Sequence, residues 1–497
     1  MPVTYATYMA DASVCRAIGI PLVGWMHFVN VLLHVLNFVL LFCLLRTLCR
    51  GGSGSAAWAL ALAMIWAVHP LRVEPVAWIA GRKELLWSLF SLAGLMLWAS
   101  SVRRREEGVV SWCPMLFAYL CCLFACLSKP TAMCFPLLAL LVEGMVRKKP
   151  WIGGLQIFVR YIPLLLLAAA TAAIAAYSQT HVAGQSATSL YAAPFLTRLV
   201  NAVSSVGFYL KAAVWPFGLH IDCRAVEGFW PLGACWNILA LVIFAGALMV
   251  VWGRAKDSQP MGKGSFAHGQ ILFALGWFLV SVFPTLGLLG SFGFEAHADR
   301  FAYVPSMMFA FLLAGCQPER FQACARKVAM LLVAVFALVT FWQLGFWRDD
   351  GVAHMRALAC DPDHPRAMVH VADSLCSRSH DFDGGISLYR KALSLSRTVP
   401  AGGFDVADTK ARLAYALASR GRAADFDEIL ILGTDVLNDF RLDRRGMMLD
   451  ALGTVMARHG DRGKAAALFQ ASLDAPARFW PKESTKRKLA ACREGGL

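Results

Sequence analysis

Long apolar runs alternate with short polar connectors over roughly the first two thirds of the chain. Several of these runs approach the roughly 20 apolar residues that a helix needs to cross a bilayer. The pattern therefore predicts about ten membrane-crossing helices. Their approximate ranges are 26–48, 55–68, 85–101, 112–127, 131–146, 157–178, 233–252, 269–289, 301–315 and 327–346.

The segment 198–218 has a helical period, but polar residues such as Arg198, Asn201 and Lys211 interrupt it. A full crossing here would move every later basic loop to the other side of the membrane. We therefore expect a re-entrant or surface-lying helix that ends at Pro216.

The pattern of residues changes after Phe346, where the apolar runs become shorter and charged residues become more frequent. Tandem amphipathic helix pairs are typical of an α-solenoid, whose concave face binds peptide or protein. We expect an all-α protein with a polytopic membrane bundle over 1–347 and a TPR-like α-solenoid over 348–497. A stabilising cap on the membrane domain is the alternative. The predicted pairs are 367–377 with 384–394, 410–419 with 426–437, and 450–459 with 463–473.

Composition excludes an ordinary soluble protein, since 58% of residues are hydrophobic and 16% are charged, with a mean hydropathy of +0.55. Residues 1–347 hold 24 Lys/Arg against 12 Asp/Glu, whereas 348–497 hold 23 against 20. Most of the net charge of +15, namely +12, therefore belongs to the membrane part, where it sets orientation rather than binds nucleic acid. The fifteen cysteines show no metal-ligand spacing.

The basic connectors fall on alternate loops, and the positive-inside rule places all of them in the cytoplasm. This assignment leaves 348–497 outside the cytoplasm. The basic connectors are Arg46–Arg50, Arg103–Arg105, Arg147–Lys149, Arg254–Lys263 and Arg320–Lys327.

The outward loops also carry ionisable residues, which are costly beside hydrocarbon unless they are paired or used. The densest loop is His69–Glu84, HPLRVEPVAWIAGRKE. Lys129 lies at the tip of a tight helical hairpin, and 297–303 follows a later span. We expect these segments to form one shared site. The alternative is a belt of interfacial ion pairs between close neighbours, such as Arg72–Glu74 and Asp299–Arg300.

Four motifs follow one another along the chain: HPLRVEPVAWIAGRKELL, CLSKPTAMCFPLLALLVE, RLVNAVSSVGFYLKAAVWP and HADRFAYVP. In content and order they resemble the transmembrane and tetratricopeptide-repeat O-mannosyltransferases and their bacterial relatives. WMHFVNVLLHVLN is similar to the second-span signature of that family through His27, Asn30, His34 and Asn37. The resemblance implies a C-type polytopic glycosyltransferase that takes a sugar, mannose-like, from a polyprenyl-phosphate carrier. It also implies a protein or glycan acceptor and an active site on the non-cytoplasmic face. For a bacterial relative we expect the inner membrane, and the basic connectors then put the C-terminal domain on the periplasmic side.

The family carries an acidic motif in its first outward loop, after a span that has no counterpart here. Residues 1–13 resemble the tail of that loop, and Asp11 is the one carboxylate before the first predicted crossing. We expect either that upstream sequence belongs to the protein or that catalysis is impaired, so that 1–497 alone is inactive. Glu74 and Asp299 are the fallback bases, or they orient the arginines.

Transfer from a lipid phosphate needs cations to hold the developing phosphate charge and a carboxylate to take the acceptor proton. The predicted catalytic residues are Glu74 and Asp299. A lipid-linked sugar is the expected donor, no other cofactor is firmly implied, and a divalent metal stays open. A polytopic transporter or flippase and a non-catalytic scaffold presenting the TPR-like domain are the alternatives. The predicted substrate-binding residues are His69, Arg72, Arg82, Lys129, His297, Arg300 and Tyr303.

Overall fold

The computed structural model forms two compact units, Met1–Trp347 and Arg348–Leu497. The described residues contain helices and no β-strand, which confirms the all-α prediction. The identities predicted for the two parts, glycosyltransferase-like and TPR-like, remain predictions. The structure describes residues 1–48, 55–109, 112–147, 154–181, 194–221, 232–257, 263–288, 297–314, 322–395, 404–437, 445–475 and 482–494.

The α-helices of the first unit are α1 (Pro2–Ile18), α2 (Leu22–Leu48), α3 (Ser55–Ala67), α4 (Val73–Ala77), α5 (Arg82–Glu106), α6 (Cys113–Ser128), α7 (Phe135–Val146), α8 (Gly154–His181), α10 (Phe195–Val214), α11 (Leu232–Asp257), α12 (Lys263–Val282), α13 (Met307–Ala314) and α14 (Gln322–Leu344). Short 3-10 helices lie between them: η1 (Pro70–Arg72), η2 (Ile79–Gly81), η3 (Pro130–Cys134), η5 (Phe283–Thr285), η6 (Asp299–Ala302) and η7 (Gly345–Trp347).

Within the described residues, five helices are long and apolar enough to cross a membrane, and a bent helix pair makes a sixth candidate. Three shorter apolar helices bring the total to nine, each at one of the ten predicted positions. These helices indicate an integral membrane protein. The five are Leu22–Leu48, Ile79–Glu106, Phe158–Ser178, His268–Thr285 and Cys324–Trp347; the pair is Ala56–Ala67 with Pro70–Ala77; the shorter ones are Cys113–Ser128, Pro130–Val146 and Cys235–Val250.

The tenth predicted crossing, 301–315, is shorter than expected. Its α-helix α13 has only 8 residues, about 12 Å at 1.5 Å per residue. The residues before it form η6 and a turn instead. Arg300 and Tyr303 are anchored there by contacts to other segments, and these contacts compete with helix formation.

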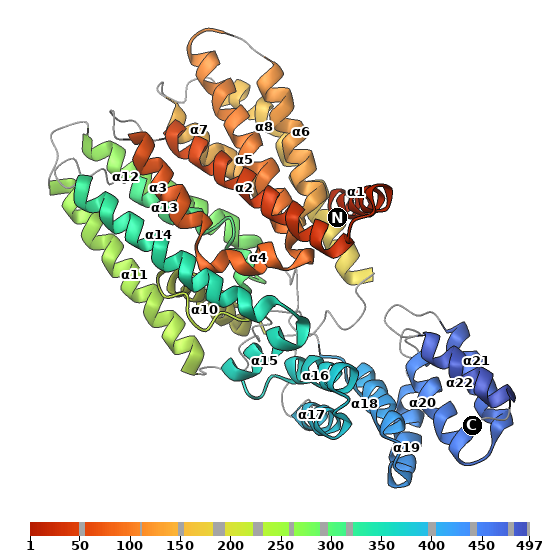
Figure 1. Cartoon of the computed structure of the whole chain (residues 1–497). Helices are drawn as coiled ribbons and strands as arrows, with labels where there is room; N and C mark the ends of the chain where they lie inside the picture. The colour runs from red at the N-terminus through yellow and green to blue at the C-terminus, as the bar shows by residue number, and fades with distance from the viewer. Residues whose placement is uncertain are drawn as a thin grey trace. The chain divides into compact units, whose positions relative to one another are not determined.

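The helices of the first unit share one apolar core, in which α5 packs against α2, α6 and α7 (Figure 1). On the other side of the bundle α12 contacts α7 and α13, and α14 contacts α3. Large side chains such as Trp98, Phe135 and Trp277 fill the interior with an exposed fraction of 1% or less. This packing gives the short connectors between the helices a rigid base.

Helix α10 contains most of the segment 198–218, which the sequence predicts as a helix that does not cross the membrane. It has 20 residues and buries Asn201, Ser204 and Ser205. It ends at Val214, before Pro216, as predicted. A polar buried face indicates packing against protein rather than lipid, which agrees with a helix that does not cross the membrane.

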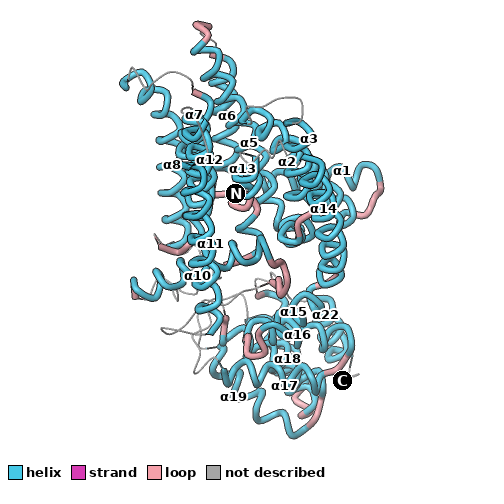
Figure 2. The backbone as a smooth tube through the Cα atoms, turned by 90° about the vertical axis from the view of Figure 1, so that its left-hand side faces the viewer, coloured by secondary structure: helices cyan, strands magenta, loops and turns pink. Residues whose placement is uncertain are grey.

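The second unit consists of α15 (Asp350–Cys360), α16 (Pro365–Ser374), α17 (Phe382–Leu395), α18 (Val406–Arg420), α19 (Phe426–Leu437), α20 (Arg445–Arg458), α21 (Arg462–Asp474) and α22 (Lys482–Glu494). A π-helical turn η8 (Leu375–Ser379) follows α16, and η9 (Ala423–Asp425) precedes α19. The three predicted pairs correspond to α16 with α17, α18 with α19, and α20 with α21. Figure 2 shows the described residues of this unit almost entirely as helices.

Small residues let the helices of this unit approach closely. A Cβ on Gly453 of α20 would lie 2.7 Å from the ring of Phe469 on α21, which is fully buried. Gly460 takes φ +82° in the turn between these helices, a conformation that favours glycine. The result is a stack of helix pairs of the kind seen in α-solenoids.

Candidate functional site

The connector between α3 and α5 consists of three short helices, η1, α4 and η2. Its axis bends by 60° where α3 ends and the η1–α4 segment begins. His69 caps η1, and its Nδ1 accepts the backbone N–H of Leu71 at 3.2 Å. Gly81 ends η2, where a Cβ would lie 2.5 Å from the carbonyl oxygen of Pro75. The connector is therefore held in one compact shape.

Both ring nitrogens of His69 are engaged, and its side chain is buried. Nε2 lies 3.1 Å from the carbonyl oxygen of Ala213 at the end of α10. Because Nδ1 accepts a hydrogen bond, the proton belongs on Nε2, which donates to that carbonyl. His69 thus links the connector to α10, and neither ring nitrogen is left for a ligand in this geometry.

Arg72 anchors the turn before α13. Its Nη1 donates to the carbonyl oxygen of Tyr303 at 2.8 Å and its Nη2 to Oγ of Ser306 at 2.6 Å. The guanidinium also lies 5.0 Å from the ring centroid of Trp66. The hydroxyl of Tyr303 is 2.7 Å from Nδ1 of His34. Arg72 and Tyr303 are therefore held by α2, α3 and each other, which suits a structural role.

Arg82, at the first position of α5, is fully buried and bound to α1 and α2. Its Nη1 forms an ion pair with Asp11, and its Nε donates to Oδ1 of Asn30 at 2.9 Å. The guanidinium lies 4.7 Å from the ring centroid of Tyr8. Trp25 Nε1 holds the other oxygen of Asp11 at 3.0 Å. Asp11 is therefore the ion-pair partner of Arg82, although the two residues are far apart in the sequence.

Glu74 binds Arg300 twice. Its Oε1 forms an ion pair with the guanidinium, and its Oε2 accepts the backbone N–H of Arg300 at 2.7 Å. Both side chains are buried. This pairing joins two connectors 226 positions apart and differs from the neighbour pairs Arg72–Glu74 and Asp299–Arg300 of the alternative hypothesis.

Asp299 lies beside this pair with an exposed fraction of 2%. Its Oδ1 has no hydrogen-bond partner among the described residues. Burial, together with the negative charge of Glu74, raises the pKa of Asp299 well above its usual range, while Arg300 and Arg72 oppose the shift. Asp299 is thus a buried carboxyl group with a strong affinity for a proton and one unoccupied acceptor atom.

Lys129 approaches the same place from the tip between α6 and η3. Its Nζ forms an ion pair with Glu84, and it lies 4.8 Å from the ring centroid of Phe301. Burial lowers the pKa of Lys129 to about 8, against the opposing effect of Glu84. The guanidinium of Arg300 lies 4.8 Å from the same ring and 5.0 Å from that of Trp78. Two cations from different segments therefore meet on Phe301.

His297 packs on Phe208 of α10 with 4.0 Å between ring centroids. Burial lowers its pKa to about 3, with further effects of His220 and Lys211. Its Nδ1 is buried and has no partner among the described residues. His297 is therefore neutral at ordinary pH and sits at the α10 side of the 297–303 segment.

The structure thus joins the three segments predicted to face outward, 69–84, Lys129 and 297–303, through their side chains. Arg300, Lys129, Glu74 and Asp299 form one group around Phe301, which we call the Phe301 cluster. Arg82 sits on α1 and α2, while His69, Arg72 and Tyr303 fix the backbone around it. That all of these residues line one cavity remains a prediction.

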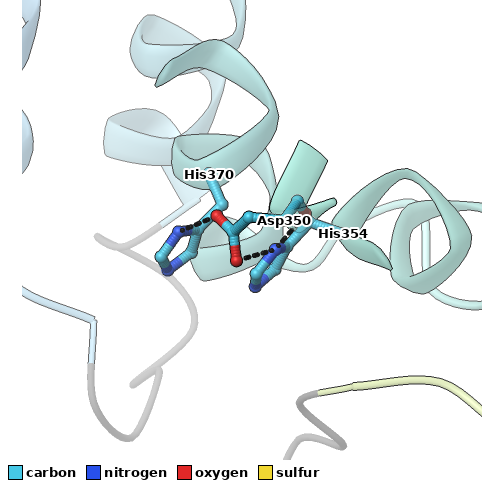
Figure 3. A group of neighbouring side chains, drawn as sticks. All are labelled: Asp350, His354 and His370. Atoms are coloured by element: carbon cyan, nitrogen blue, oxygen red, sulfur yellow. Dashed lines mark hydrogen bonds and ion pairs between the residues drawn. The ribbon is translucent and has the colours of Figure 1, made fainter. Parts of the chain in front are cut away.

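One group of residues in the described part of the second unit has side chains of the kind that bind metal ions, namely Asp350, His354 and His370 (Figure 3). The two Nδ1 atoms lie 3.4 and 3.2 Å from different oxygens of the Asp350 carboxylate. The imidazole rings are stacked at 4.0 Å and 13°. In-plane lone pairs of parallel rings do not converge on one ion, so this arrangement links α15 to α16 rather than forming a ready metal site.

The fold and the Phe301 cluster define a helical membrane protein with paired charges at one end of its bundle. No protein-family model and no solved structure matches the chain. The chain is similar to the protein O-mannosyl-transferase TMTC3 of Mus musculus, with 23% identity over 407 residues, and to the protein O-mannosyl-transferase tmtc2 of Xenopus laevis, with 35% identity over 92 residues. These matches cover 74% and 18% of this chain but 41% and 10% of the relatives. The distant similarity supports a glycosyltransferase-like function.

Proposed function

We propose that this protein is a membrane glycosyltransferase that moves a mannose-like sugar from a polyprenyl-phosphate carrier to a protein hydroxyl. The observation that carries this proposal is the Phe301 cluster, where Arg300 and Lys129 meet beside the acidic pair Glu74 and Asp299. A dianionic or monoanionic phosphate needs such cations, and they act most strongly where water is excluded.

In the proposed reaction the acceptor oxygen attacks the anomeric carbon, and the bond from that carbon to the carrier phosphate oxygen breaks. The bonding electron pair leaves with the phosphate, whose growing charge Arg300 and Lys129 stabilise. The acceptor proton passes to Asp299. A carboxylate with a raised pKa is a stronger base than an ordinary one while it is ionised, and the positive charges of Arg300 and Arg72 favour the ionised form of Asp299.

Glu74 has a positioning role in this proposal. It holds the guanidinium and the backbone N–H of Arg300, so it fixes the direction from which the cation meets the phosphate. Glu84 does the same for Lys129, and Trp87 Nε1 holds the other Glu84 oxygen at 2.9 Å.

We place the Phe301 cluster on the non-cytoplasmic side, because the basic connectors of the sequence lie on the alternate loops. We further propose that the protein lies in a bacterial inner membrane. In this orientation residues 348–497 would then lie in the periplasm. The second unit would then meet folded or unfolded protein acceptors there.

The second unit offers an apolar groove to such a peptide. A hollow of about 480 Å³ lies on α19, α20 and α21, with Lys464 at its edge. Grooves of this kind between solenoid helices accept apolar side chains of a bound segment. The lining side chains include Leu430, Leu437, Leu452, Met456 and Leu468.

The test is sugar transfer by the native protein in its membrane, with a radiolabelled polyprenyl-phosphate mannose as donor. Asp299→Asn should lower the transfer rate by about 10²–10⁴-fold, the usual effect of losing a general base. Glu74→Gln should chiefly weaken donor binding. Arg104→Gln, on the exposed far end of α5, is the control and should transfer normally. Movement of the labelled lipid across the membrane without transfer would contradict the proposal and favour a flippase.

A further inference from the structure

A second cluster of charges lies at the far end of α5, away from the Phe301 cluster. Arg105 is 23 positions after Arg82 on the same helix, a distance of about 35 Å along its axis. This is close to the thickness of a bilayer core with its inner headgroup boundary. The far end of α5 therefore lies at the opposite membrane surface.

Glu143 of α7 is the carboxylate at the centre of this second cluster, and its acceptor positions are filled. Its Oε1 accepts from Arg147 at 3.0 Å and Arg160 at 3.1 Å. Its Oε2 accepts from Trp98 Nε1 at 3.1 Å and from the hydroxyl of Tyr161 at 2.9 Å. A carboxylate has about four lone-pair sites. No acceptor site is left for a hydrogen bond from a further cation.

Arg105 is that further cation. No carboxylate of the described residues forms an ion pair with it, and its guanidinium lies 5.7 Å from the ring centroid of Trp112. The Nε atoms of both Arg105 and Arg160 are buried without a hydrogen-bond partner in the described part of the chain. Three guanidiniums, those of Arg105, Arg147 and Arg160, thus lie near the single carboxylate of Glu143.

A pocket of about 630 Å³ opens between Arg105 and Arg160. The volume falls in the range of small-ligand sites. Its polar end holds Arg105, Arg160 and Tyr119, and its outer wall is apolar. Leu116 and Val159 of that wall have exposed fractions of 57% and 54%, so the wall is open to the outside of the helix bundle.

We propose that this pocket binds a phospholipid with an anionic headgroup, with the phosphate between Arg105 and Arg160 and the acyl chains along α6 and α8. The charge excess selects an anion, and the open apolar wall selects one that carries hydrocarbon. Basic pockets between membrane helices are typical sites for such headgroups. The proposal is independent of the glycosyltransferase proposal, because it concerns the opposite end of the bundle.

The experiment is native mass spectrometry of the full chain in mixed micelles that contain equal amounts of phosphatidylglycerol and phosphatidylcholine. The wild-type protein should retain phosphatidylglycerol preferentially. Arg105→Gln should lower that retention about fivefold, since a basic residue at a membrane surface contributes about 1 kcal/mol to anionic lipid binding. The matched control is Arg104→Gln, which removes the same charge from an exposed neighbour and should leave retention unchanged.

A second variant, Leu116→Trp, fills the pocket without altering its charge and should lower retention as well. Equal losses for the variants at positions 104 and 105 would assign binding to a diffuse basic surface and overturn the proposal. Unchanged retention in Leu116→Trp would also overturn it. Displacement of the lipid by millimolar glycerol 3-phosphate would assign the pocket to a soluble phosphate instead.

Discussion

The buried ion pair between Arg300 and Glu74 makes the stability of the Phe301 cluster measurable. Both side chains have exposed fractions of 7% or less. Removing one partner leaves the other charge buried and uncompensated, which costs about 3–5 kcal/mol. Arg300→Met and Glu74→Gln should therefore each destabilise the membrane unit by about that amount.

The double variant Arg300→Met/Glu74→Gln should recover most of this loss. It removes both charges together with the cost of burying them, and replacement of a buried pair by groups of similar volume is often close to neutral. The backbone N–H at position 300 keeps an acceptor, because the side-chain amide that replaces the Glu74 carboxylate still presents an oxygen.

Thermal unfolding in detergent, followed by the helical circular dichroism signal, measures these differences. The matched control is Arg422→Met in the exposed ion pair with Asp383, whose side chains have exposed fractions of 59% and 58%. Because Asp383 keeps Arg420 as a partner, this change should cost less than about 1 kcal/mol. If Arg300→Met lowered stability no more than Arg422→Met, or if the double variant were as unstable as the two single losses combined, the buried-pair account would be refuted.

Donor binding should weaken as the pH rises through about 8, because the pKa of Lys129 is lowered to about 8 and the amine binds phosphate only while it is protonated. A pH titration of donor binding by the Lys129→Arg variant should show no such weakening. If the weakening survived in that variant, this role of Lys129 would be contradicted. Gly81→Ala should lower the thermal stability of the membrane unit by about 1–3 kcal/mol, because its Cβ would lie 2.5 Å from the Pro75 oxygen; an unchanged melting temperature would speak against this close contact. Phe469→Ala should cost the second unit about 3–5 kcal/mol, since the ring is fully buried; urea unfolding of the full chain would measure it, and a loss below about 1 kcal/mol would contradict the packing of α20 on α21.

The helices were predictable from the sequence because their signals are local. An apolar run of membrane length or an amphipathic pair is visible within a window of about 20 residues. The helical period of 198–218 and its end before Pro216 were predicted correctly, since α10 ends at Val214; that α10 does not cross the membrane stays a prediction. The predicted crossing 301–315 was too long, because Glu74 and Arg72 hold the 299–306 segment outside α13. Contacts between residues so far apart in the sequence do not appear in the local pattern of apolar residues.

The residues of the candidate site were predictable as types, but their partners were not. The sequence singled out Arg82, whereas its partner Asp11 lies 71 positions earlier on a helix that was not anticipated. One signal was present, since Thr4, Tyr8 and Asp11 recur at helical spacing and face one side of α1. Pairing across the fold depends on tertiary packing, which a single sequence does not encode locally.

The central claim is that the Phe301 cluster holds the phosphate of a lipid-linked sugar, and direct donor binding tests it. The measurement compares the affinity of the purified chain for a polyprenyl-phosphate mannose with that for the same polyprenol without phosphate. We predict that the phosphate-bearing donor binds at least about tenfold more tightly, as expected for a difference of about 1.4 kcal/mol or more, and that the folded double variant Arg300→Met/Glu74→Gln loses this preference while Arg104→Gln keeps it. Equal affinity for the two lipids, or an undiminished preference in the double variant, would contradict the account.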